Sequence, residues 1–490
     1  MRFARPKSFV AAIIILLLGF LAAGMVAFAQ QLSRGDVVTG MRTIGAGGAV
    51  WGLYVAMDGF FLGSGIAVMA AACMARFSRD RKLEALARIA MPVAIACFLG
   101  AAVSVVADQG RPFVALVNLA RFARPRSPFF VTFTTVIAVC LYGSLVHCLL
   151  ARRPDLAEYA KHPSRWQPFQ RLLAARYSGT LAERARRQRV GFWMSLLMLP
   201  ALLATLTALA IIFTVRPGRP LFVTMIEVMA FLLVAGAGGL GLLAIAAALV
   251  EHFAGTPAGL QPRAYARLGR VLLVTISLAL LAVVGAELAG LLSREAAVAN
   301  YARALLDRSY APLFWCELGC LFVAGGLLWR SARRRNLRPR IVIVAGALTL
   351  IAVFLQRYLL LVAWQTHGLS LPYRPGGYCP SWVEGEVALG IVALCILALL
   401  PAVRLIPFAP LAFDTPPLPR VGGNRRRAVV TGIWFGFGLA ATGAGFLLCG
   451  RVGTESFQDP ILTASPVVFI AGLVMLASTG AVYELLPDRG

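Results

Sequence analysis

Twelve apolar segments, each long enough to cross a lipid bilayer, constrain the fold of this sequence more than any other feature. A hydrocarbon core of about 30 Å requires about 20 predominantly apolar residues in a helix. Hydrophobic residues make up 59% of the chain and charged residues 14%, whereas soluble domains average about 25% charged residues. The sequence therefore predicts an all-α polytopic membrane protein with about twelve transmembrane helices, at 9–29, 46–74, 90–108, 128–150, 191–215, 221–250, 271–292, 311–330, 341–363, 384–403, 428–449 and 464–484.

The distribution of basic residues predicts how these helices are oriented. Lys and Arg accumulate in the cytoplasmic loops of membrane proteins, and most of the 47 Lys and Arg residues lie on the side of the N-terminus. Both termini are therefore expected in the cytoplasm, with 9–29 retained as a helix. The same rule accounts for the net charge of +26 without nucleic acid as a partner. The most basic inner loop, 152–189, is expected to lie near anionic lipid headgroups.

Similar short stretches recur in the same order along the chain and indicate an internal duplication. One pair opens two predicted helices, SPFF at 127–130 and APLF at 311–314. The repeats predict two tandem four-helix bundles, helices 2–5 and 6–9, related by an axis along the membrane normal. The expected domains are an N-terminal helix with its outer loop, the two bundles, a segment with helix ten, and a C-terminal helix pair, at 1–45, 46–215, 216–363, 364–427 and 428–490.

The helix at 51–72 carries a carboxylate among apolar neighbours. Asp58 is followed by Gly59, Gly63 and Gly65, and small residues of this kind let a second helix pack closely. A charged side chain inside a span costs roughly 2.5–3.5 kcal/mol on insertion scales, so it requires a local reason. For Asp58 a functional reason is favoured over packing alone.

Other ionisable residues lie in the outer halves of the predicted helices. Intramembrane carboxylates usually mark proton or ligand paths, whereas acids at helix ends also act as caps. For Asp108 and Arg111 a structural ion pair is as reasonable as a functional role. The candidates beside Asp58 are Asp108, Glu227, Glu287, Glu317, Arg357 and Glu384.

The cysteine and histidine residues give no framework for a metal or redox centre. Cys316 and Cys320 are spaced by one helical turn, but no further ligand lies near them in sequence, so core packing is favoured. No haem or metal is expected in the chain. One haem bound between His147 and His252 stays open as an alternative.

Two predicted outer loops are unusually rich in cationic and aromatic residues. Loop 109–127 carries arginines against the charge trend of the other outer loops, and loop 364–383 carries His367 with several Pro, Tyr and Trp residues. An aromatic belt at the membrane interface explains the tryptophans but not the arginines. The composition suggests an ordered lid or a docking surface for an acidic partner protein.

In these stretches the chain resembles the NrfD/PsrC (polysulphide reductase) membrane subunits, and most closely their HybB/DsrP branch. The resemblance covers about 50–405 and depends on the order of several short motifs. These are WGLY at 51–54 with the Gly-rich helix after it, DQGRP at 108–112, SP at 127–128, FW at 314–315 with Glu317, Arg357, and YCPSWVE at 378–384.

The resemblance implies a quinone-reactive membrane anchor of an oxidoreductase complex in the bacterial inner membrane. Such an anchor binds menaquinone or ubiquinone near the outer face and exchanges electrons with a ferredoxin-like iron–sulphur subunit, which contacts a larger catalytic subunit. The family's quinone region corresponds here to Asp58, Asp108 and Arg111. Further candidates for quinone binding or a proton path are Trp51, Tyr54, Glu227, Glu287, Glu317, Arg357, His367 and Glu384.

A secondary transporter is the alternative to this interpretation. Twelve helices with repeats and buried carboxylates also fit that class, in which two bundles rock about a site at the membrane midplane. The predicted polar residues crowd one face rather than the midplane, which favours the quinone-reactive subunit.

Overall fold

The computed structural model is helical through almost all of the residues that it describes, and these contain no strand. Twelve of its helices are long and apolar enough to cross a membrane, which confirms the predicted class of an all-α polytopic membrane protein. The described residues are 7–42, 48–77, 81–114, 134–161, 163, 166–175, 177–215, 219–254, 262–334, 337–367, 377–405, 425–449 and 460–486.

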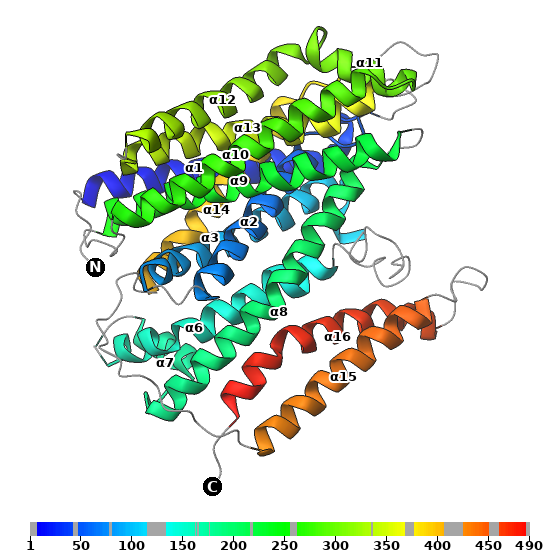
Figure 1. Ribbon diagram of the computed structural model, residues 1–490. Helices are drawn as coiled ribbons and strands as arrows, with labels where there is room; N and C mark the ends of the chain where they lie inside the picture. Colours follow the sequence, from blue (N-terminus) through cyan, green and yellow to red (C-terminus); the bar gives the residue numbers. More distant parts are fainter. Residues whose placement is uncertain are drawn as a thin grey trace. The chain divides into compact units, whose positions relative to one another are not determined.

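The membrane-spanning helices follow the predicted order along the chain (Figure 1). They are α1 (Lys7–Arg34), α2 (Leu53–Phe77), α3 (Arg81–Asp108), the π-helix η3 (Val136–Gly143) continued by α6 (Ser144–Tyr159), α8 (Leu181–Thr214), α9 (Leu221–Ala254), α10 (Pro262–Leu291), α12 (Ala311–Arg333), α13 (Pro339–His367), α14 (Trp382–Leu405), α15 (Arg425–Cys449) and α16 (Pro460–Leu485). Three short helices accompany them: η1 (Asp36–Val38), α7 (Gln167–Ala174) and α11 (Ala296–Leu306).

The chain divides into two compact units, each made of several chain segments. Unit 1 comprises Met1–Ala71, Ala96–Pro112 and Leu206–Leu400. Unit 2 comprises Ala72–Ile95, Phe113–Thr205 and Pro401–Gly490. The five expected domains stay a prediction.

In unit 1, helices α9, α10, α12 and α13 pack against one another as a bundle, and Figure 1 shows them side by side. These are helices 6–9 of the sequence prediction. Gly241 of α9 and Gly346 of α13 bring the two backbones into contact: a Cβ at Gly241 would lie 2.9 Å from the Gly346 carbonyl oxygen. Small residues at this crossing permit the close approach.

Helix α2 packs through its small residues within unit 1. A Cβ at Gly65 would lie 2.8 Å from the Cβ of Cys97 in α3, and a Cβ at Gly63 would lie 3.3 Å from that of Ala235 in α9. A larger side chain at Gly65 would therefore separate the helices. The glycines that follow Asp58 are accounted for by helix packing.

The start of α2 lies later than the sequence prediction of residue 46. The first helical residue is Leu53, and its backbone N–H donates to the Tyr378 hydroxyl at 2.8 Å. A helix leaves its first N–H groups without partners inside the helix, so a side chain that accepts from one of them fixes the terminus. The backbone N–H groups of Val50 and Trp51 donate to Gln365 instead.

In unit 2, the expectation that 152–189 is a surface loop is wrong for its first part. Helix α6 continues to Tyr159 and α8 begins at Leu181, and Arg152 and Arg153 are buried. Arg153 Nη1 lies 2.6 Å from the Glu484 carboxylate of α16, and the same guanidinium also contacts Glu183. Buried charges require partners, and these partners are distant in sequence, so the loop's composition did not reveal them.

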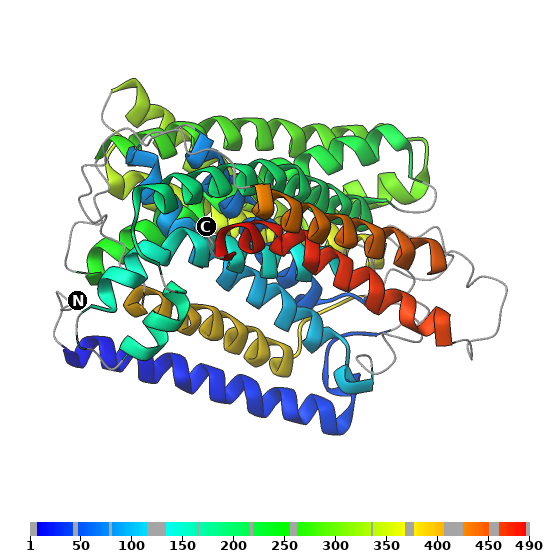
Figure 2. The ribbon, with the colours of Figure 1, turned by 90° about the horizontal axis from the view of Figure 1, so that it is seen from below.

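The C-terminal helices α15 and α16, orange and red in Figures 1 and 2, run side by side. Their interface is built from small residues: a Cβ at Gly472 would overlap the Thr442 hydroxyl oxygen, and one at Gly445 would meet Phe469. Helix α16 also packs against η3 and α6. The predicted C-terminal pair is therefore an integral part of unit 2.

Candidate functional site

Polar residues of unit 1 gather at one end of its four-helix bundle. This end, termed here the Arg219 end, is where α9 and α12 begin and α10 and α13 end. Glu227 lies near the start of α9, Glu287 near the end of α10 and Glu317 near the start of α12. At 1.5 Å per residue these carboxylates lie within about two turns of the helix termini.

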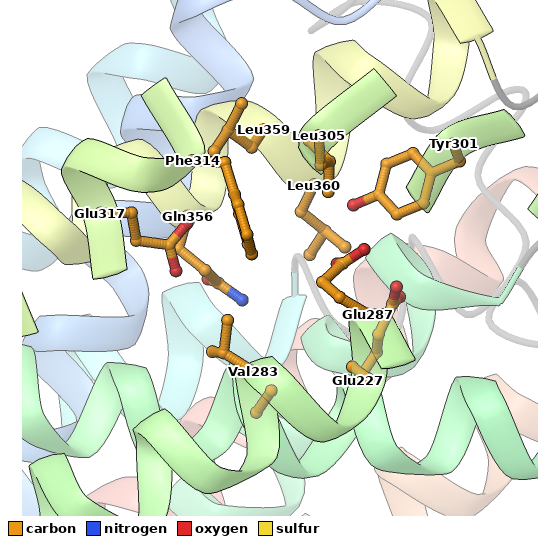
Figure 3. A pocket seen from close by; sticks show the side chains of 12 residues that line it. Glu227, Val283, Glu287, Tyr301, Leu305, Phe314, Glu317, Gln356, Leu359 and Leu360 are labelled. Atoms are coloured by element: carbon orange, nitrogen blue, oxygen red, sulfur yellow. The ribbon is translucent and has the colours of Figure 1, made fainter. Parts of the chain in front are cut away.

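Side chains from all four helices of the bundle line one cavity of about 30 Å³ at the Arg219 end. Such a cavity has room for about two water molecules, since one requires about 10–15 Å³. Helix α11 covers part of it with Tyr301. The lining residues (Figure 3) are Glu227, Ala230, Val283, Ala286, Glu287, Tyr301, Leu305, Phe314, Glu317, Gln356, Leu359 and Leu360.

Glu227 is the carboxylate of this cavity whose charge is neutralised by a direct partner. Both terminal nitrogens of Arg219 donate to its two oxygens, a bidentate pair that is almost completely buried. The guanidinium carbon also lies 5.4 Å from the Tyr301 ring centre and 4.9 Å from that of Trp364. The two rings contact each other edge-on, with centres 5.4 Å apart, so the guanidinium lies beside both of them. A bidentate pair that also contacts aromatic rings is a geometry that arginine forms and lysine does not.

Glu287 and Glu317 are arranged differently from Glu227. Each is buried, and each has one carboxylate oxygen that lacks a hydrogen-bond partner among the described residues, Oε2 of Glu287 and Oε1 of Glu317. In the view of Figure 3 the Phe314 ring stands between Glu317 with Gln356 and the pair Glu227 and Glu287. The cavity thus holds two carboxyl groups without a direct counter-charge, and the Phe314 ring is part of its wall.

Tyr301 adds a hydroxyl group to the wall of the cavity. Burial raises the pKa of Tyr301 well above its ordinary value, and the nearby carboxylates of Glu227 and Glu287 raise it further. The phenol therefore keeps its proton at all physiological pH values. It can donate a hydrogen bond into the cavity but cannot serve there as a base.

Arg357 lies next to this cavity and is completely buried. It donates to Gln356 Oε1 at 2.5 Å and to the Phe231 carbonyl oxygen at 2.9 Å. Its guanidinium also stacks on the Phe231 ring. Electrostatic interaction with Glu317 is present, but the two side chains do not form a direct ion pair. Arg357 is thus a buried cation satisfied mainly by neutral groups.

Asp58 occupies the first turns of α2, also within unit 1. Asp58 is 9% exposed, and its carboxylate receives no hydrogen bond in the part of the chain that the structure describes. The neighbouring helix surface is aromatic, since Phe213 lies against Gly59 and its ring meets the Trp51 ring edge-on at 6.3 Å. Asp58 is therefore a carboxyl group without a direct counter-charge, and its neighbour Gly59 packs against this aromatic pair.

Asp108 ends α3 and lies in a cluster of acids. It is half-buried, interacts electrostatically with Asp36, Asp58 and Glu384, and its Oδ1 has no hydrogen-bond partner among the described residues. Arg111 is exposed and does not pair with it. The intervening Gly110 has φ +60°, and a Cβ there would lie 2.5 Å from Asp36 Oδ2. The turn therefore requires glycine.

Tyr54 is oriented by a glutamine that the sequence analysis did not single out. The buried Gln31 of α1 accepts from the Tyr54 hydroxyl at 2.9 Å and donates to Asp36 and to the Ala107 carbonyl oxygen. One side chain thereby ties α1 and α2 to the end of α3. Gln31 lies in the polar last turns of α1, beside Gln30 and before Ser33, so nothing in the sequence distinguished it.

Trp51 and Glu384 hold the segments that precede helices. The backbone of Trp51 exchanges two hydrogen bonds with the Gln365 side chain. Glu384 accepts from the backbone N–H groups of Gly40 and Ser381, while Ser381 Oγ accepts from the Glu384 N–H. The last two bonds form a capping box at the start of α14. The structure therefore gives Glu384 a capping role, and any proton-path role stays a prediction.

Tyr378 completes the contacts of Glu384. Its hydroxyl donates to Glu384 Oε1 at 2.5 Å. Burial raises the pKa of Tyr378, and this hydrogen bond raises it further, so the phenol remains a donor. Tyr378, Gln365 and Gln31 are positioning residues that the motif-based reasoning missed, because neutral polar residues at helix ends carry little signal in one sequence.

His367 ends α13 and is half-buried. Its Nδ1 lies 2.9 Å from Thr366 Oγ1 and its Nε2 lies 3.4 Å from Ser309 Oγ, while the Tyr310 ring meets the imidazole edge-on. It lies apart from the residues that line the cavity. Residues 115–127 of the first cationic or aromatic loop and 368–376 of the second lie outside the described residues, as do His162 and the side chain of His252. The predicted lid or docking surface therefore stays a prediction.

Within the described ranges no group of three or more His, Cys, Asp or Glu side chains is placed to hold a metal ion. The three glutamates of the cavity are included in this finding.

Comparison with protein families adds to this geometry. The family model described as "Polysulphide reductase, NrfD" matches residues 43–367. The chain belongs to the NrfD family. The match runs from just before α2 to the end of α13, so it includes the cavity, Asp58 and Asp108, whereas α14, α15 and α16 lie beyond it.

A curated relative of this NrfD-family chain, from Halobacterium salinarum, is described as a putative membrane subunit of dimethyl sulfoxide reductase. The two are 29% identical over 237 residues, which cover 48% of this chain and 50% of the relative. The chain thus spans about half the length of the relative that it matches. The resemblance to the HybB/DsrP branch stays a prediction.

Proposed function

We propose that this NrfD-family chain is the quinone- or quinol-reactive membrane subunit of a multisubunit oxidoreductase. Support comes from the family match and from the relative, which is named as the membrane subunit of a reductase. The multi-pass membrane architecture is the setting in which such a protein meets a lipid-soluble substrate.

The observation that carries this proposal is the state of Asp58. Reduction of a quinone consumes two electrons and two protons, so its site requires apolar walls and a group that exchanges protons. Asp58 is buried and lacks a direct counter-charge, and the adjacent Gly59 packs against Phe213, whose ring meets that of Trp51. In this proposal Asp58 exchanges protons with the quinone oxygens, and Asp108 and Arg111 shape the pocket.

The electrons come from outside this chain in the same proposal. A ferredoxin-like iron–sulphur subunit docks on the outer face and connects the chain to a larger catalytic subunit. The chain lies in the bacterial inner membrane with both termini in the cytoplasm. Menaquinone and ubiquinone both fit the requirement, and Glu227, Glu287 and Glu317 form a polar route in the second bundle.

The substitution Asp58→Asn tests the assignment, because it keeps the side chain's size and removes its ability to exchange a proton. We expect quinone-linked turnover of the purified complex to fall by about 10²–10⁴-fold, the contribution typical of general acid–base catalysis. Assembly with the partner subunits, measured by co-purification, should be unchanged.

The matched control is Asp307→Asn, the same chemical change at an exposed position near the start of α12. It should leave turnover unchanged. Normal turnover in the Asp58→Asn complex would overturn the role of Asp58.

A further inference from the structure

The cavity at the Arg219 end contains more acid than its basic partner compensates. Arg219 pairs with Glu227. Glu287 and Glu317 each have one buried carboxylate oxygen without a hydrogen-bond partner among the described residues. Glu317 is 1% exposed and Glu287 is 8% exposed. Nothing in the geometry of α10 or α12 requires an acid at either position, since neither side chain caps a helix.

We propose that this cavity is a proton-holding site, in which Glu287 and Glu317 bind protons that pass between them through about two water molecules. Phe314 is the partition that separates the two carboxyl groups. The inference deepens the proposed function, on which it rests for the link to quinone turnover. The cavity itself can be tested without quinone.

A negative charge on Glu287 or Glu317 would be buried and therefore costly. An uncompensated carboxylate in a low-dielectric interior costs several kcal/mol, and burial of a second one beside Glu227 would add repulsion. A protonated carboxyl group carries no charge and so avoids both costs. Its O–H can also donate a hydrogen bond within the cavity. Glu287 and Glu317 are therefore sites where protons reside, not fixed negative charges.

Glu287 and Glu317 line the same cavity, which is large enough for water. Cavities that remain dry are apolar, whereas polar cavities of sufficient size hold water that bonds to two to four groups. Here the water would have the oxygens of Glu287 and Glu317, the Gln356 amide and the Tyr301 hydroxyl as partners. When one of the two acids has released its proton, the proton of the other crosses the water and binds the resulting carboxylate, so no electron or further reactant is needed.

Glu287 and Glu317 have different surroundings. Glu287 faces Glu227, Arg219 and Tyr301, whereas Glu317 lies toward Gln356 and the buried cation Arg357. Figure 3 shows Phe314 between these two groups. In this proposal a proton on Glu287 lies on the side of Arg219, and a proton on Glu317 lies on the other side of the Phe314 ring.

The test is infrared spectroscopy of the full chain in lipid nanodiscs without quinone. Protonated buried carboxyl groups give C=O stretching bands that shift on exchange from H₂O to D₂O. We expect one such band to be lost in Glu287→Gln and a different one in Glu317→Gln, with the other band retained in each variant; any band from Asp58 should persist in both. Glu295→Gln, the same change at an exposed position beside α11, should remove neither.

Phe314 is tested by the rates at which the two bands shift in D₂O. In the unmodified protein the Glu317 band should shift several-fold more slowly than the Glu287 band. Phe314→Ala should bring the two rates together, whereas Phe314→Tyr should keep them apart. Equal rates in the unmodified protein would overturn the partition.

Other outcomes overturn the site itself. If neither glutamine substitution removes a band, the two acids do not hold protons. If addition of Na⁺ alone removes both bands, the cavity binds a cation instead. Thermal unfolding of each variant verifies folding, and the turnover of the Asp58→Asn complex decides the quinone role separately.

Discussion

Charged side chains of unit 1 differ in how their charge is compensated inside the protein. Glu227 has a direct bidentate partner, Arg357 is satisfied by an amide, a carbonyl oxygen and an aromatic ring, and Asp58 has no partner among the described residues. A buried pair contributes little net stability, yet the loss of one member leaves an unpaired charge. The three residues are therefore expected to respond differently to substitution.

Substitution of Arg219 by Gln should strongly destabilise unit 1. It leaves the Glu227 carboxylate buried without its Arg219 partner and removes the cation that contacts the Tyr301 and Trp364 rings. We expect a loss of about 3–5 kcal/mol in the free energy of unfolding, as for other broken buried pairs. Unfolding in detergent with a chemical denaturant measures it.

A comparison with Arg308→Gln gives the control for this prediction. Arg308 and its neighbour Asp307 are both exposed, and exposed pairs contribute about 0–1 kcal/mol. The double variant Arg219→Gln/Glu227→Gln should recover part of the lost stability, because it leaves no unpaired charge. A double variant as unstable as the single one would contradict the explanation.

Helix ends in unit 1 are fixed by side chains from other segments. Tyr378 accepts from the first turn of α2, Gln365 holds the backbone before it, and Ser381 with Glu384 caps α14. Such contacts satisfy the N–H groups that a helix leaves unpaired. The start of an element in this protein therefore depends on tertiary contacts as well as on hydropathy.

At the interface of α15 and α16, Gly472→Val should prevent the observed packing. A Cβ at Gly472 already overlaps the Thr442 backbone nitrogen and hydroxyl oxygen, so a branched side chain must push the helices apart. Overpacking of this kind costs about 1–3 kcal/mol, occasionally more. The midpoint of thermal unfolding should fall accordingly.

Gly443→Val is the matched substitution on α15. A Cβ at Gly443 meets no atom within 4 Å, so the change should leave the unfolding midpoint close to that of the unmodified protein. Equal destabilisation by both valines would show that loss of glycine, and not the close crossing, is responsible.

Among the described residues, buried charges are arranged differently in the two units. Unit 1 contains the direct pair of Arg219 and Glu227 together with carboxyl groups that have no direct partner around a small cavity. Unit 2 has directly paired charges, with Arg153 joined to Glu484 and Glu183, and with Asp155 joined to Arg88 and Arg152. The charges of unit 2 fasten helices together.

The effect of Glu484→Gln should therefore be confined to unit 2. It removes the closer of the two carboxylates that compensate the buried Arg153 and leaves Glu183, so the loss should reach at most about 3–5 kcal/mol, the value for a broken buried pair. Hydrogen–deuterium exchange should rise in α6, α7 and α16 and stay unchanged in α9, α10, α12 and α13. Glu158→Gln, which affects an exposed pair with Lys161, should change neither region.

Hydropathy alone determined the class of this protein and the order of its membrane helices. A run of about 20 apolar residues is a local property, so each span could be recognised from its own residues. The same local reasoning placed Glu227, Glu287 and Glu317 near one end of the bundle. It did not predict that Arg219 pairs with Glu227 or that Arg153 pairs with Glu484.

Tertiary structure decided which polar groups meet. Helices that are apolar on all sides carry little information about which face turns inward, so the sequence could not show that Glu287, Glu317 and Gln356 line one cavity with Phe314 between the acids. Charge pairing likewise depends on residues far apart in the chain, as the buried Arg152 and Arg153 show. Span positions are therefore encoded locally, whereas the candidate site exists only through packing.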